Sequence, residues 1–105
     1  PQFVEAARAL GTRAMKEGGK SVESRLAFAF RLSTSRAASA PELAILVAEF
    51  KDRLGEFQKD AGRTKAYLAG GGTLQADPDL DPAQLAAYAA VSSLILNLDE
   101  SISKS

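Results

Sequence analysis

The chain has 105 residues, 46% of them hydrophobic, and its 13 basic and 13 acidic side chains cancel to zero net charge. This length suits one domain with a single core, and the balanced charge gives no overall field that would attract nucleic acid or an acidic membrane. Because cysteine and histidine are both absent, disulfides, zinc–thiolate sites, cysteine nucleophiles, histidine bases and covalent haem attachment are excluded.

The first predicted helix spans residues 2–17. Its apolar side chains recur at spacings of three and four residues, and Arg8 and Arg13 lie off that stripe. The stripe consists of Phe3, Ala7, Leu10 and Ala14. Gly18-Gly19 ends the helix, because a residue without Cβ can adopt the left-handed backbone of a helix stop.

Residues 22–34 predict the second helix. Ser21 is the expected N-cap, and Glu23 lies in the first turn, where the helix dipole favours an acid. The main apolar stripe is Val22, Leu26, Ala29 and Phe30, and it is widened by Phe28 and Leu32. A stripe of this width predicts that the helix touches two neighbours.

The third helix begins at Ser39-Ala40-Pro41-Glu42, a capping box in which Ser39 and Glu42 each accept from the other's backbone amide. Its apolar pattern continues past Gly55 and consists of Leu43, Leu46, Val47, Phe50, Leu54 and Phe57. Asp60 is expected to cap a short fourth helix over residues 61–69, anchored by Tyr67 and Leu68 and ended by Gly70-Gly71-Gly72. Residues 70–80 then form a loop.

The last helix is predicted from Pro82 to about residue 103, with Asp81 as its N-cap. Residues 82–98 carry no charge, so the helix is apolar on nearly every face and must be surrounded by other helices. The stretch is short of the roughly 20 apolar residues of a membrane span. We therefore predict a single all-α domain over residues 1–105, a compact helical bundle of four main helices plus one short helix, with the C-terminal helix central.

The charges are distributed unevenly along the chain. Residues 1–36 hold seven arginines and lysines against three glutamates, whereas residues 77–100 hold five acids and no base. Because the arginines are spread through the helices, we interpret the two segments as neighbours that neutralise each other and expect no nucleic-acid partner.

Two motifs resemble chemical sites but lack residues that those sites require. Gly70-Gly71-Gly72-Thr73 lacks the lysine and the preceding strand of a phosphate-binding loop. Asp77, Asp79 and Asp81 have the spacing that opens a calcium loop, but the positions that need glycine and glutamate hold Pro82 and Tyr88. Whether this acidic 77–81 segment makes a weak surface contact with a cation stays open.

The remaining acids and serines indicate no catalytic site. Asp99 and Glu100 are adjacent, so on a helix they point about 100° apart and do not share a substrate. Ser101 and Lys104 lie at a chain end, and no serine has an activating base. We predict no catalytic, cofactor-binding or metal-binding residues in this domain.

Three polar residues are expected at contacts that specify the fold. Asn97 should bond to another helix or its loop, Arg31 should reach an acid such as Asp99, and Arg36 should bond carbonyls in the link between the second and third helices.

A resemblance to a known family spans nearly the whole chain. The strings that carry it are Pro1-Gln2-Phe3-Val4-Glu5-Ala6-Ala7-Arg8-Ala9-Leu10, Ala29-Phe30-Arg31-Leu32 followed by Ser35-Arg36, Ala40-Pro41-Glu42-Leu43, Asp79-Leu80-Asp81-Pro82-Ala83-Gln84-Leu85-Ala86-Ala87-Tyr88, and Leu96-Asn97-Leu98-Asp99-Glu100. In this order and spacing they resemble the C-terminal planctomycete-specific domain of unknown function, found in large cytochrome-c-like proteins of planctomycete bacteria. The chain departs from the family pattern at Ser35, where glycine is common, and in the 70–73 loop.

The resemblance implies a context. Such parents carry a secretion signal, a haem-binding cytochrome segment and sometimes a sugar-binding-like module upstream, so an extracytoplasmic location, periplasmic or at the cell surface, is implied. Because the sequence opens at Pro1 without an initiator methionine, we expect a C-terminal fragment of a larger protein. Haem would belong to upstream domains, since only Met15 could serve as an axial ligand here.

Two functional hypotheses follow. The first is a non-catalytic helical packing and interaction module of a secreted cytochrome-associated protein, which binds upstream domains or a protein partner. The alternative is an accessory domain that completes an enzyme site formed by upstream domains, with Asp77, Asp79 or Asp99 as contributed acids. Alanine at all three acids leaves the parent's activity intact under the first hypothesis and abolishes it under the second.

Overall fold

The computed structural model describes the backbone of residues 2–69 and 80–103, and the side chains of residues 5–69 and 80–98. In these ranges the chain forms five helices: α1 (Gln2–Glu17), α2 (Val22–Thr34), α3 (Ala40–Lys59), α4 (Ala61–Ala69) and α5 (Pro82–Ser103). The predicted all-α bundle of four main helices and one short helix is confirmed. Residues 70–79 of the predicted 70–80 loop lie outside the described residues.

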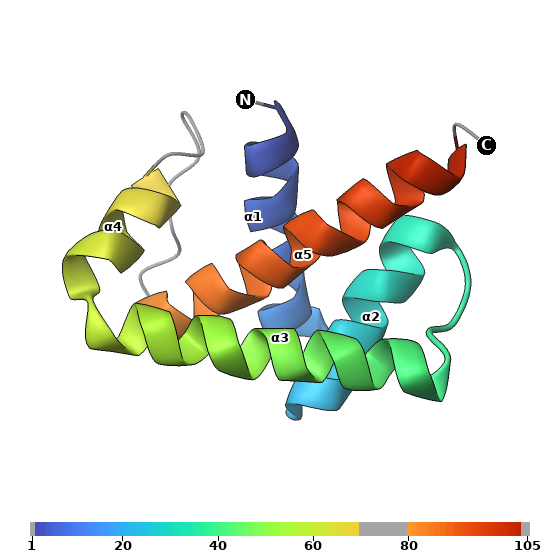
Figure 1. Ribbon diagram of the computed structural model, residues 1–105, viewed down its shortest axis with the longest axis horizontal. Helices are drawn as coiled ribbons and strands as arrows, with labels where there is room; N and C mark the ends of the chain where they lie inside the picture. The colour runs from blue at the N-terminus through green and yellow to red at the C-terminus, as the bar shows by residue number, and fades with distance from the viewer. Residues whose placement is uncertain (1, 70–79, 104–105) are drawn as a thin grey trace.

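Helix α5 occupies the middle of the bundle. It runs across the molecule in Figure 1, with α3 along one side, and it contacts each of the other four helices. Eight of its side chains are at most 1% exposed: Leu85, Ala86, Ala87, Tyr88, Ala89, Val91, Ser92 and Ile95. The charge-free segment is therefore a core helix, as predicted. Within the described residues, none of the helices is both long enough and apolar enough to cross a membrane.

The predicted caps position the helix ends. The side chains of four residues accept hydrogen bonds from backbone amides in the first turn that follows: Ser21, Ser39, Asp60 and Asp81. At α3 the box is reciprocal, because the Ser39 amide also donates to Glu42 Oε1 at 2.8 Å. At the other end of α1, Gly19 adopts φ 93° and lets the chain turn into α2.

Helices α1 and α5 approach each other unusually closely. An ideal Cβ built on Gly11 would lie 2.9 Å from the backbone nitrogen of Ala89. Small side chains flank this point, since Ala7 and Ala14 of α1 are buried together with Ala86 of α5. The absence of a side chain at Gly11 therefore sets the distance between the two helices.

The structure corrects two expectations about which residues face solvent. Arg8 was predicted to lie off the apolar stripe but is only 3% exposed, because neighbours cover α1 over a wider arc than its apolar stripe. Leu32 was predicted to widen the buried face of α2 but is 42% exposed. Successive helical residues turn by about 100°, so Leu32 points almost opposite to buried Phe30.

Candidate functional site

The structure brings together no catalytic or metal-binding constellation among the residues it describes. Within that part of the chain, no three acidic side chains lie close enough to hold a metal ion. Asp81, the described member of the acidic 77–81 segment, caps α5 by accepting from the Gln84 amide at 2.9 Å. Asp77, Asp79 and the 70–73 glycines lie outside the described residues, so the cation question stays open.

Arg36 makes the predicted contact with a carbonyl and three further ones. Its Nη1 donates to the Ala37 carbonyl at 3.3 Å, and its two terminal nitrogens donate to the Glu42 carboxylate at 2.9 and 2.8 Å. The guanidinium also lies 4.8 Å from the centre of the Phe30 ring. These contacts connect the end of α2 to the start of α3.

The pKa of Glu42 is lowered from 4.5 to about 2. The side-chain hydrogen bonds from Arg36 are the larger cause, and the hydrogen bond from the Ser39 amide is the next.

Glu42→Gln is expected to lower the melting temperature at neutral pH and to remove part of the acid sensitivity of the fold. Because the folded-state pKa of Glu42 is depressed, its ionised form stabilises the protein fully above pH 4.5, and this stabilisation is lost as the pH falls toward about 2. The melting temperatures of wild type and variant should therefore converge across that range. Thermal unfolding followed by circular dichroism at a series of pH values measures the difference.

Glu17→Gln is the matched control for this prediction. Glu17 also accepts two hydrogen bonds from one arginine, Arg13, and its pKa is lowered for that reason, but it caps no helix. We expect a smaller effect of the same sign. A gap between wild type and Glu42→Gln that stays constant down to acidic pH would contradict the assignment.

Of the other two predicted polar contacts, that of Asn97 is not seen among the described residues, and that of Arg31 with Asp99 is not tested. Asn97 is exposed, and its side chain has no hydrogen bond to a described residue. Leu98 beside it is 52% exposed. Arg31 is exposed and pairs with no described acid; the side chain of Asp99 lies outside the described residues.

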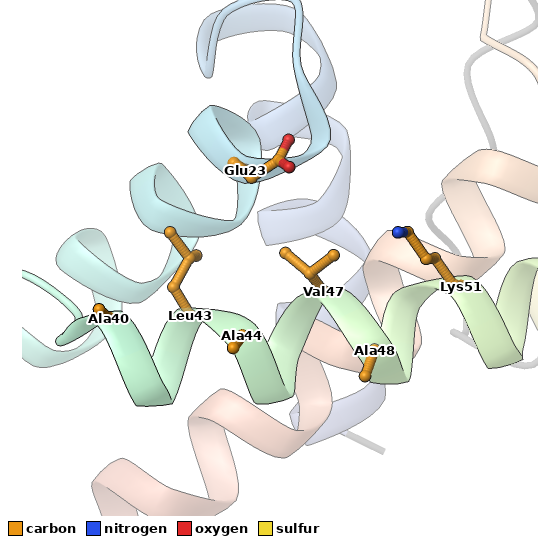
Figure 2. A pocket seen from close by; sticks show the side chains of 7 residues that line it. All are labelled: Glu23, Ala40, Leu43, Ala44, Val47, Ala48 and Lys51. Atoms are coloured by element: carbon orange, nitrogen blue, oxygen red, sulfur yellow. The ribbon is translucent and has the colours of Figure 1, made fainter.

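A shallow groove of about 460 Å³ lies between the start of α2 and the first half of α3. Figure 2 shows Leu43 and Val47 extending from α3 toward α2, with Glu23 of α2 above them and Lys51 further along α3. The full lining is Glu23, Ala40, Leu43, Ala44, Val47, Ala48 and Lys51. We call this the α2/α3 groove. Its apolar lining residues lie between two side chains of opposite charge, Glu23 and Lys51.

The groove continues onto the outer side of α3. Residues 43–48, Leu-Ala-Ile-Leu-Val-Ala, carry no charge, yet only Leu46 among them is buried. Ala44 and Ala48 are exposed, and Ile45 is 65% exposed. The predicted apolar stripe of this helix did not include Ala44, Ile45 or Ala48, and the charge-free run is the signal that could have indicated a second apolar face.

Comparison with protein-family models, with curated proteins and with solved structures gives no match for this chain. The similarity to the planctomycete domain therefore stays a prediction, and function must be argued from the surface itself.

Proposed function

We propose that this chain is a non-catalytic helical interaction module that binds a protein surface with the α2/α3 groove and the adjoining side of α3. The observation that carries this proposal is the charge-free run at residues 43–48, in which Ala44 and Ala48 are exposed and no described residue covers Ile45, which is 65% exposed. Contiguous apolar surface with charged side chains at its edge is typical of protein–protein contact sites.

The chemistry of the described residues supports a binding role. The acids with defined contacts serve the fold: Asp60 and Asp81 cap helices, and Glu42 holds the α2–α3 link. Burial raises the pKa of Tyr67, but its ring packs against Phe57 with centroids 5.2 Å apart, a structural contact. The alternative of an accessory enzyme domain relies on Asp77, Asp79 and Asp99, and no observation on the described residues favours it.

The resemblance suggests where such a module acts. We propose a secreted, cytochrome-associated parent in which the groove packs against upstream domains or a protein partner, on the extracytoplasmic side. The sequence of the parent tests this context directly. A signal peptide and a Cys-x-x-Cys-His haem motif upstream are expected, and a parent that lacks both overturns the proposed context.

Photo-crosslinking tests the binding surface. A photoreactive amino acid replaces Ala48 in the groove, and a second variant carries it at Lys65, which is exposed on α4. In cells that produce the parent protein, we expect a defined crosslinked species from position 48, to the same polypeptide, to a second copy or to another protein. Crosslinking at position 48 no greater than at position 65 would contradict the proposed function.

A further inference from the structure

Arg8 is a charged side chain that the bundle encloses. It is 3% exposed, and it lies one turn before Gly11, about 60° around the axis of α1 from the residue that meets the α5 backbone. Its guanidinium nitrogens Nε and Nη2 are buried, and neither donates a hydrogen bond to any described residue. An arginine does not lose its proton in proteins. A positive charge is therefore held here without an acceptor in the described part of the chain.

The surroundings of Arg8 supply no compensating charge within the described ranges. Helix α5 is the main neighbour of α1, and residues 82–98 carry no charge. Asp81, just before this helix, accepts from the Gln84 amide as its cap. No described acid forms an ion pair with Arg8, including Glu5 one turn before it. Because a buried charge without a partner strongly destabilises a fold, such a group indicates a bound molecule or ion that is not part of the chain.

The two nitrogens also define the acceptor that satisfies them. The N–H bonds of Nε and Nη2 lie parallel along one edge of the guanidinium group, and the two oxygens of a carboxylate match this spacing. Arg13 on the same helix shows the pairing, since its Nε and Nη2 donate to the two carboxylate oxygens of Glu17 at 3.0 and 3.1 Å. A halide ion has no second acceptor atom, so the geometry favours a carboxylate over chloride.

We propose that Arg8 binds the carboxylate of a small organic acid through its Nε–Nη2 edge, beside the crossing of α1 and α5. This site is separate from the α2/α3 groove and does not rest on the function proposed for that groove. The carboxylate neutralises the guanidinium and accepts from both nitrogens, and burial strengthens both hydrogen bonds because the local dielectric constant is low. Few atoms make few contacts, so we expect a dissociation constant on the order of 10 mM for formate.

Differential scanning calorimetry of the purified chain tests the site with formate as the probe and chloride at the same concentration as the reference. In about 100 mM formate, the melting temperature of the wild type should be about 6 °C higher than in chloride. Arg8→Met removes the charge and keeps a long apolar side chain, and it should show no such shift. Arg8→Lys keeps the charge without the two-nitrogen edge, and its shift should be less than half that of the wild type.

Arg31→Met is the matched control, because it removes the same charge from an exposed position on α2. It should keep the full response of the wild type to formate. A formate shift of equal size in the wild type and in Arg8→Met would be a general effect of the salt on stability, and it would overturn the site.

The stability of Arg8→Met in chloride gives a second test. Replacing an unpaired buried charge by an apolar side chain of similar length is neutral or stabilising, whereas removing one partner of a buried ion pair is strongly destabilising. We therefore expect Arg8→Met to melt in chloride at the temperature of the wild type or higher. A melting temperature lower by more than about 5 °C would show that an acid of the chain itself compensates Arg8, and it would overturn the proposal.

Nuclear magnetic resonance measures the binding directly. The Nε–H group of Arg8 gives a signal in a proton–nitrogen correlation spectrum, and its loss in Arg8→Lys assigns it. On titration of the wild type with formate, this signal should move and saturate with a midpoint on the order of 10 mM. A signal that stays in place up to about 100 mM formate would overturn the site.

Discussion

Gly11→Val is expected to lower the free energy of unfolding by about 3 kcal/mol, and Gly11→Ala by about 1–2 kcal/mol. A Cβ at this position would lie 2.9 Å from the nitrogen and 3.1 Å from the Cα of Ala89, and 3.2 Å from the carbonyl carbon of Tyr88. All three are backbone atoms of the central helix and cannot move aside as a flexible side chain does. The helices α1 and α5 must therefore separate and lose packing along their contact.

Gly55→Ala is the matched control, because it makes the same chemical change in the interior of another helix. A Cβ at Gly55 would meet nothing within 4 Å, so only the helix propensity changes, and the chain should gain about 0.5–1 kcal/mol. Urea unfolding followed by circular dichroism at low protein concentration compares the two variants. A Gly11→Ala chain as stable as Gly55→Ala would show that the α1–α5 crossing is wider than described.

The ends of the helices could be predicted from the sequence because caps depend on residues within four positions of each other. Ser39 with Glu42 and Asp81 with Gln84 satisfy backbone amides through contacts that a linear pattern contains in full. The central place of α5 followed from the same kind of reasoning, since a helix without charge has no face suited to solvent.

The packing between helices could not be predicted in this way. Gly11 and Gly55 are both glycines inside apolar periodic segments, and only the arrangement of the helices shows that one meets backbone and the other meets nothing. The burial of Arg8 and the exposure of Asn97 likewise depend on how far neighbouring helices extend. The α2/α3 groove is lined by residues of both helices, so it depends on how α2 and α3 lie relative to each other.

Tyr88→Ala is expected to lower the free energy of unfolding by about 3–5 kcal/mol, as for other large aromatic residues removed from a core. Tyr88 is 1% exposed, and its ring packs on Phe50 with centroids 4.3 Å apart. The guanidinium of Arg25, which also donates to the Gly19 carbonyl at 3.0 Å, lies 5.7 Å from the ring centre. The residue thus joins α5 to α3 and to the α1–α2 turn.

Tyr88→Phe distinguishes the contribution of the ring to stability from that of the hydroxyl. The hydroxyl is buried and has no hydrogen-bond partner in the part of the chain that the structure describes, and a buried polar group without a partner costs about 1–3 kcal/mol. Phenylalanine keeps the ring contacts with Phe50 and Arg25, so the variant should be as stable as the wild type or more stable by about 1 kcal/mol. Denaturant unfolding of the wild type, Tyr88→Ala and Tyr88→Phe ranks their free energies of unfolding. If Tyr88→Phe were less stable than the wild type by more than about 1 kcal/mol, the hydroxyl would be hydrogen-bonded in solution. Opposite signs for the two substitutions would show that the ring stabilises this core and that the hydroxyl does not.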